Sequence, residues 1–275
     1  MNKISLHDLF DQLWEFYATQ NPQVPEIHNL LSRREDLANL VNDHIALRTF
    51  ADPRINLEIL AKNFTRLGFE EQASYELAEK NVFAKYYVHP SGQWPKVFIS
   101  ELQLDSLSQK AQALIQELIG QIPEKVLQSH ALCAMGRPWD LNYSTYQKLQ
   151  QESEYAAWMS AHGFQMNHAT LSVNDMTSFA NLEALVSFLE ENGFEMNGQD
   201  SNQEIQKAFD PHGDYLLKQA STLAAKVNVK FLDGERIIPG CYYEFIERFQ
   251  GYEGFDPGNA SKIMESTNMR NHRGH

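Results

Sequence analysis

The sequence has little cysteine, a deficit of basic residues and no long apolar run. Its 275 residues include two cysteines, too few for a disulfide framework. No stretch approaches 18 uninterrupted apolar residues, the length that a membrane-spanning helix needs. Acidic residues interrupt the apolar stretch at the N-terminus, which is unlike a signal peptide. We therefore expect a cytoplasmic protein with no membrane partner.

The excess of acidic residues excludes a further class of partner. The 36 Asp and Glu residues outnumber the 23 Lys and Arg residues, giving a net charge of −13. A field of that sign repels nucleic acid, so we expect no nucleic-acid partner. The sequence also lacks glycine-rich nucleotide loops, a Gly-x-Ser-x-Gly elbow and a His-Glu-x-x-His motif. An anionic substrate must therefore be bound by particular local cations.

An internal repeat is the main feature that is present. The segments 41–50 and 166–175 alternate like strands, and the segments 56–70 and 181–195 have helical apolar spacing. Both helical segments begin Asn-Leu-Glu and end Gly-Phe-Glu, and each follows its strand at a similar spacing. The chain therefore contains two copies of one structural unit.

The repeat predicts an α+β fold. In the first half three further strands are expected at 69–77, 81–90 and 95–104. In the second half the stretch around 224–235 and then the segment 241–249 are expected to supply the further strands. Each half then has the order βαβββ, with an insertion expected in the second half between Asn197 and Ala220. We predict a single domain over 1–275 in which paired βαβββ modules, 41–104 and 166–249, form a curled sheet, with additional helical segments at 1–40 and 105–165. Ser32 and Glu35 have the spacing of a capping box that would open a second N-terminal helix.

His44 and His168 occupy matched positions in the two copies. Each alone would be typical of a buried core histidine, but together with Glu244, on the last strand of the second copy, they indicate a metal site. Two imidazoles and one carboxylate form a facial triad that leaves coordination positions open, as catalytic metals require. The alternative for Glu244 is a surface position on an edge strand. Glu101, on the last strand of the first copy, is the corresponding carboxylate and is a fourth ligand, a supporting group or a surface residue.

Arg48 follows His44 by four residues, so a strand places both side chains on the same face. A guanidinium there can bind a substrate carboxylate through two hydrogen bonds. The alternative is an ion pair with a buried carboxylate. These ligand types suit Fe(II) and zinc alike.

Three motifs resemble one known family. Asn-Asp-His-Ile-Ala-Leu-Arg-Thr-Phe from Asn42, Asn-His-Ala-Thr from Asn167 and Tyr-Tyr-Glu-Phe-Ile-Glu-Arg from Tyr242 are similar to the 2-oxoadipate dioxygenase/decarboxylase family, which includes hydroxyglutarate synthase. The segment from Gly254 to Asn268 resembles the family's C-terminal end, and the likeness runs from about residue 10 to 268. The arrangement of the repeat resembles the vicinal oxygen chelate superfamily.

The resemblance implies a function. It assigns His44, His168 and Glu244 as ligands of Fe(II), leaves Glu101 outside the ligand set, and makes Arg48 the catalytic substrate-binding residue, with His44 and His168 also beside the substrate. The expected partners are a 2-oxo acid and dioxygen, and the expected reaction converts 2-oxoadipate to 2-hydroxyglutarate and carbon dioxide. Two alternatives stay open: a zinc-dependent hydrolase or isomerase on the same scaffold, and a non-enzymatic protein that binds a small ligand. No feature of the sequence sets the oligomeric state.

Overall fold

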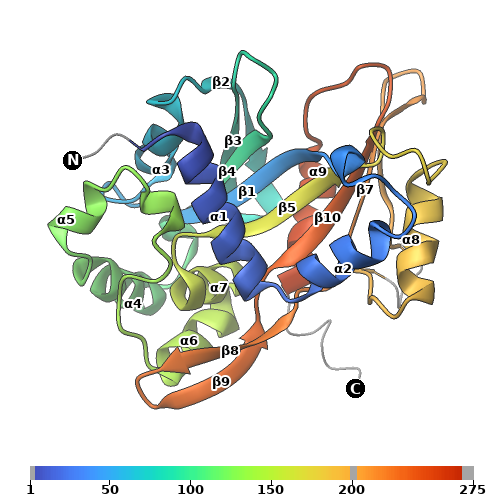
Figure 1. The fold of residues 1–275 in the computed structure, drawn as a ribbon. Coiled ribbons are helices and arrows are strands. Elements are labelled where there is room, and N and C mark those ends of the chain that lie inside the picture. The colour runs from blue at the N-terminus through green and yellow to red at the C-terminus, as the bar shows by residue number, and fades with distance from the viewer. Residues whose placement is uncertain (1–3, 199–202, 268–275) are drawn as a thin grey trace.

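A curled sheet of eight strands forms the centre of the protein (Figure 1). The computed structural model describes residues 4–198 and 203–267, so Asn268, at the end of the family-like C-terminal segment, lies outside the described residues. The strand order in the sheet is β2-β3-β4-β1-β5-β10-β7-β6. Strands β1 and β5, which carry the two matched histidines, therefore lie side by side in the middle of the sheet.

The sheet consists of two copies of one module. The first copy contains β1 (Asn42–Phe50), α3 (Leu57–Thr65), β2 (Glu70–Leu77), β3 (Val82–Val88) and β4 (Lys96–Leu102). The second contains β5 (Met166–Ser172), α8 (Leu182–Glu191), β6 (Gln206–Phe209), β7 (Tyr215–Ser221) and β10 (Tyr242–Arg248). In each copy the first strand is parallel to the last, and the copies join through the antiparallel pair β1–β5. The predicted α+β fold of paired βαβββ modules is confirmed.

The insertion in the second copy lies at a different place from the one predicted. The segment expected to be inserted, 197–220, contains β6 and most of β7, which belong to the main sheet. The inserted element is instead the hairpin of β8 (Lys226–Phe231) and β9 (Gly234–Pro239), which forms its own two-stranded sheet (Figure 1). The prediction was wrong because the hairpin alternates more clearly in sequence than the short, polar strand β6.

Helices cover both faces of the sheet. In Figure 1, α1 (Leu6–Gln20) and α2 (Gln23–Leu31) lie in front of the central strands, and α9 (Pro257–Ile263) lies behind them. The predicted segment between the modules forms α4 (Gln109–Gly120), α5 (Glu124–Leu127), α6 (Tyr143–Glu152) and α7 (Glu154–His162). Within the described ranges, no helix combines the length and apolarity needed to cross a membrane.

The capping box predicted at Ser32 is absent, because α2 ends at Leu31 and Ser32 is its C-cap. Glu35 instead accepts hydrogen bonds from the backbone N–H groups of Thr177 and Ser178 at 2.7 Å each. This buried carboxylate joins the segment before β1 to the loop after β5, and so it helps to fix the two central strands at one end.

Candidate metal centre

The sheet brings together the three residues that the repeat had singled out. His44, His168 and Glu244 lie on the adjacent strands β1, β5 and β10, and one ligand atom from each lies within 4.8 Å of the others. The Oε2 atom of Glu244 is 3.0 Å from Nε2 of His168 and 3.6 Å from Nε2 of His44. With 1% of its surface exposed, Glu244 is not a surface residue on an edge strand.

A second carboxylate, that of Asp43, orients the imidazole of His44. Nδ1 of His44 lies 2.8 Å from Oδ1 of Asp43, so the proton on Nδ1 is donated outward and Nε2 is left toward the cluster. Asp43 in turn accepts from Nε and Nη2 of Arg248 at 2.7 and 2.8 Å. The other histidine differs, because Nδ1 of His168 is buried and has no hydrogen-bond partner among the residues described.

Polar side chains also fix the carboxylate of Glu244. Gln219 donates from Nε2 to Oε1 of Glu244 at 2.6 Å, which leaves Oε2 directed at the two imidazoles. Thr170 donates to Oε2 at 3.1 Å, and its hydroxyl lies 3.0 Å from Nε2 of His44. The cluster therefore has a defined geometry with a single carboxylate oxygen facing the imidazoles.

Burial and charge set the protonation of the cluster. Burial would raise the pKa of Glu244, but the two adjacent histidines outweigh it and hold that pKa well below its usual range. Burial would lower the pKa of His44, but the carboxylates of Glu244 and Asp43 outweigh it and raise the pKa. For His168 burial prevails, and its pKa is lowered. A buried carboxylate needs a positive partner, and a divalent cation held by these three residues would supply one.

The donor set fits a catalytic metal. Two imidazole nitrogens and one carboxylate oxygen, all buried and mutually close, are the donor types of a facial triad that suits non-haem Fe(II) and catalytic zinc alike. Three protein ligands leave coordination positions for substrate. The carboxylate contact of His44 is the kind of support that metal-binding histidines receive.

Little space remains beside the cluster. A cavity of about 20 Å³ adjoins it, lined by apolar residues of the sheet and of the C-terminal segment such as Phe98, Phe255, Ile263 and Met264. Phe255 packs edge-on against the ring of His44, with ring centroids 4.8 Å apart. A volume of this size holds about one water molecule. The C-terminal segment therefore leaves little room beside the centre on the side of α9.

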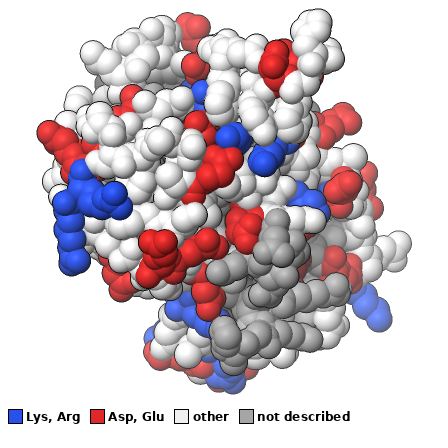
Figure 2. Space-filling model, turned by 90° about the vertical axis from the view of Figure 1, so that its right-hand side faces the viewer, with Lys and Arg blue, Asp and Glu red and all other residues white. Residues whose placement is uncertain are grey.

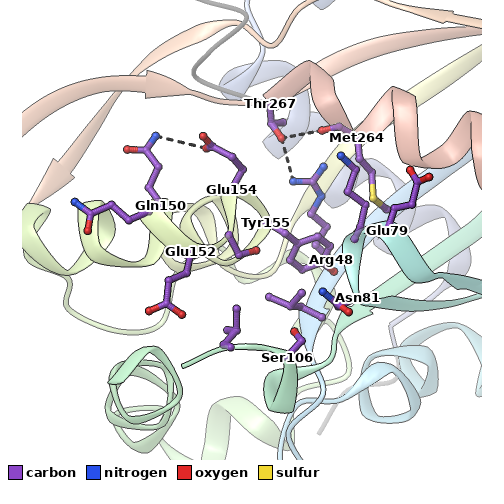
Figure 3. Close-up of a pocket in the computed structure, with 15 residues that line it drawn as sticks. Arg48, Glu79, Asn81, Ser106, Gln150, Glu152, Glu154, Tyr155, Met264 and Thr267 are labelled. Atoms are coloured by element: carbon purple, nitrogen blue, oxygen red, sulfur yellow. Dashed lines mark hydrogen bonds between the residues drawn. The ribbon is translucent and has the colours of Figure 1, made fainter. Parts of the chain in front are cut away.

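Arg48 borders a second, larger cavity of about 330 Å³ (Figure 3). Its guanidinium is buried, donates from Nη1 to the Thr267 hydroxyl at 3.3 Å, and lies 5.0 Å from the ring centres of Tyr155 and Trp158. Nε and Nη2 of Arg48 have no partner within the described part of the chain. Met264 lines both cavities and so forms part of the wall between them.

These contacts bear on the alternative interpretation of Arg48 as an ion-pair residue. The expected alternative, an ion pair with a buried carboxylate, is not found among the described residues, where Arg48 forms no salt bridge. Its cation faces aromatic rings and a hydroxyl group, with two N–H groups unused. On the face shown in Figure 2, acidic side chains gather in several groups with basic ones between them, so this face has no broad positive surface for an anion.

Glu101 does not correspond to Glu244, contrary to the sequence-based assignment. Glu244 pairs with Thr170, two residues after His168, and the residue paired at the same place in the first module is Phe98. Glu101 instead accepts from the N–H of Leu57 at the start of α3, at 2.8 Å. The equivalent contact in the second module joins Glu247 to the N–H of Leu182 at 3.1 Å.

The repeated glutamates therefore stabilise helix starts. Asn56 and Asn181 cap the same two helices with their side chains, which explains why both helices begin with asparagine. Asp43 and Gln219 also support the cluster, and neither was predicted to do so from the sequence. Asp43 was visible beside His44 in the motif, whereas Gln219 lay in the segment interpreted as an insertion.

Known proteins share this architecture. Paired βαβββ modules around a buried His–His–Glu cluster define a protein of the glyoxalase type of fold. A solved structure from Ralstonia eutropha JMP134, named as a glyoxalase superfamily protein, has this fold with a TM-score of 0.74 at 20% identity, over 90% of this chain and 85% of that one.

The family model for 2-oxoadipate dioxygenase/decarboxylase matches residues 8–251, so the chain belongs to this family of decarboxylating oxygenases. The chloroplastic 2-oxoadipate dioxygenase/decarboxylase of Arabidopsis thaliana is 31% identical over 93% of this chain and 76% of the relative. The crystal structure of hydroxyglutarate synthase in complex with 2-oxoadipate from Oryza sativa has a TM-score of 0.85 at 29% identity, over 96% of this chain and 92% of that one. The predicted family and enzyme class are confirmed.

Another similar solved structure has a different name. A crystal structure from Shewanella frigidimarina NCIMB 400 is 39% identical, with a TM-score of 0.84 over 93% of this chain and 99% of that one, and carries a provisional hydrolase name.

Proposed function

We propose that this protein is an Fe(II)-dependent dioxygenase that converts 2-oxoadipate to 2-hydroxyglutarate and carbon dioxide. The observation that carries the proposal is the buried cluster of His44, His168 and Glu244 in a chain of this family. In the balanced reaction the six-carbon 2-oxo diacid loses one carbon as carbon dioxide. One atom of dioxygen enters the new carboxylate, and the other enters the hydroxyl group.

The protein supplies the geometry of the reaction. His44, His168 and Glu244 hold the metal, and Asp43 and Gln219 keep the ligand atoms directed inward. Bound Fe(II) supplies the activation of dioxygen. The surrounding apolar side chains exclude water, which protects the reaction from side products.

Arg48 binds a substrate carboxylate. Its Nε and Nη2 groups are buried donors with no acceptor among the residues that the structure describes, and leaving such donors unpaired is costly. A carboxylate between them satisfies both. Because the net charge of −13 gives a dianion no general attraction, this local cation accounts for selection of a diacid.

A six-carbon diacid is larger than the 20 Å³ cavity at the cluster, so substrate needs the space on the other side of Met264 as well. The flexible, unbranched Met264 side chain separates this space from the cluster. We infer that movement of Met264 joins the two cavities, which places one end of the substrate at the cluster and the other beside Arg48.

Anaerobic loading with Fe(II), followed by measurement of oxygen uptake with a series of 2-oxo acids, tests the function. We expect uptake with 2-oxoadipate and formation of 2-hydroxyglutarate. His44→Ala, His168→Ala and Glu244→Ala should each lower metal content and abolish turnover while circular dichroism shows a folded chain. Full metal occupancy in His168→Ala would contradict the assignment of the ligands.

A zinc-dependent hydrolase is the second candidate. The Shewanella relative's hydrolase name favours it, and a site of this kind binds zinc more tightly than Fe(II). Oxygen consumption distinguishes the two, because hydrolysis uses water alone. Turnover that persists with zinc in the absence of dioxygen would support the hydrolase and refute the dioxygenase.

A further inference from the structure

Tyr242 lies between the metal cluster and Arg48. It precedes Glu244 by two residues on β10, so both side chains lie on the same face of the sheet. Tyr242 is fully buried and lines the cavity at the cluster. Its ring stacks on that of His168, with centroids 4.7 Å apart and planes 24° from parallel. The phenol is therefore in place to meet a molecule bound at the cluster.

The hydroxyl group of Tyr242 has an unused proton. It accepts a hydrogen bond from Nδ2 of Asn167 at 3.3 Å, and residues 4–198 and 203–267 supply no acceptor for the proton of the hydroxyl itself. The hydroxyl group is therefore a buried donor whose proton is available to a bound ligand.

Unused donors of Tyr242 and Arg48 occur together. Arg48 carries two buried N–H groups with no described acceptor, and its guanidinium lies beside the Tyr242 hydroxyl. Buried donors from two neighbouring side chains suit an anion with more than one oxygen atom. A carboxylate has that form and accepts from a guanidinium and a phenol at once.

We infer that Tyr242 is a specificity-determining residue whose hydroxyl, together with Arg48, binds the carboxylate of the substrate that lies away from the metal. This inference rests on the proposed function. The ring of Tyr242 packs on His168 while its hydroxyl lies near Arg48, so the residue spans the distance between the two ends of a bound diacid. Tyr242 therefore favours a substrate that has a second carboxylate at the end away from the metal.

The neighbouring Tyr243 provides a matched control. It is also fully buried, but it faces the opposite side of the sheet, where its hydroxyl lies 2.7 Å from Nε2 of His28. Tyr243→Phe therefore removes a buried hydroxyl from the same strand without touching the cavity, whereas Tyr242→Phe removes the proposed donor and keeps the ring against His168.

The experiment measures ligand binding by calorimetry on metal-loaded protein without dioxygen. The ligands are 2-oxoadipate and 2-oxohexanoate, which has the same chain length but lacks the second carboxylate. A hydrogen bond to a charged group contributes about 1.5–3 kcal/mol, so Tyr242→Phe should weaken 2-oxoadipate binding by roughly 10- to 100-fold. Binding of 2-oxohexanoate and metal content should stay as in the wild type, and Tyr243→Phe should bind both acids normally.

The outcomes separate this inference from the function on which it rests. Wild-type protein that binds 2-oxoadipate, with Tyr242→Phe binding it equally well, overturns the role of Tyr242 and leaves the proposed function standing. Equal weakening of both acids overturns the assignment to the second carboxylate, because it shows an effect through His168. Wild-type protein that binds neither acid overturns the proposed function and the inference together.

Discussion

Replacing Asp43 by Asn should weaken the contact that orients the imidazole of His44 toward the metal cluster. Asp43 accepts from Nδ1 of His44 and from two nitrogens of Arg248, all within 2.8 Å. Asn keeps one acceptor oxygen but loses the negative charge. Loss of such a contact to a metal-binding histidine typically lowers metal affinity by about 10- to 100-fold.

The same change should also destabilise the fold. Only 9% of the Arg248 side chain is exposed, and breaking a buried ion pair by removing one partner costs about 3–5 kcal/mol. A second variant separates the two effects. In Asp43→Asn/Arg248→Met neither charge remains, and replacing a buried pair by neutral groups is often close to neutral in stability. Arg248 also donates to the backbone carbonyls of Tyr252 and Gly254, and Lys96 also contacts Asp43. The double variant should therefore recover only part of the lost stability and none of the lost metal affinity.

Thermal unfolding of the metal-free proteins measures the stability, and titration of metal against a competing chelator measures the affinity. The reasoning is refuted if Asp43→Asn binds metal as tightly as the wild type. Recovery of both stability and affinity in the double variant would refute it as well, because Asp43 would then act on the metal only through the stability of the fold.

Three further predictions concern Arg48, which is proposed to bind the substrate, and carboxylates outside the metal cluster. Arg48→Ala should lower kcat/KM for 2-oxoadipate by roughly 30-fold or more, since truncating one partner of a desolvated charge pair costs about 2–5 kcal/mol. Arg48→Lys should restore part of the lost kcat/KM. Unchanged kcat/KM in the Ala variant would show that Arg48 has a structural role. Glu101→Gln should keep full metal content in a chelator assay and lower the melting temperature, as should Glu247→Gln, because both carboxylates bind helix N-termini; loss of metal from Glu101→Gln would contradict its placement. Burial would raise the pKa of Glu35, but hydrogen bonds from Asn39, Ser178 and Thr177 outweigh it and lower the pKa to about 2. This carboxylate therefore stabilises the fold above its unfolded pKa of about 4.3, and the stabilisation is lost as pH falls toward 2. Glu35→Ala should cost about 1–3 kcal/mol at pH 7 in urea unfolding and flatten this acid dependence; an equally steep dependence in the variant would contradict it.

The sequence determined the module and most of the cluster. Strand alternation, helix capping by Asn and the closing Gly-Phe-Glu are local patterns, so two copies of them identify equivalent positions without any structure. That equivalence selected His44 and His168, and the motif around Glu244 supplied the third residue. Arg48 followed from the two-residue period of a strand, which fixes the face on which a side chain lies.

Only the tertiary structure decided which segments pair. The hairpin 226–239 has the stronger strand pattern but is inserted, whereas the polar strand β6 joins the sheet, because strand pairing depends on partners distant in sequence. The register of β4 against β1 likewise places Phe98 at the position that Glu244 occupies in the other module, and it directs Glu101 to a helix start.

The support of the cluster is also a tertiary property. The contacts of Asp43 with Arg248 and of Gln219 with Glu244 join residues from different strands, so no spacing along the chain could indicate them. The unused donors of Arg48 and Tyr242 are visible only when every neighbouring acceptor is known. The sequence therefore specified which residues carry the chemistry. The packing of distant strands specified how each of these side chains is oriented, because the contacts that orient them join segments far apart in the sequence.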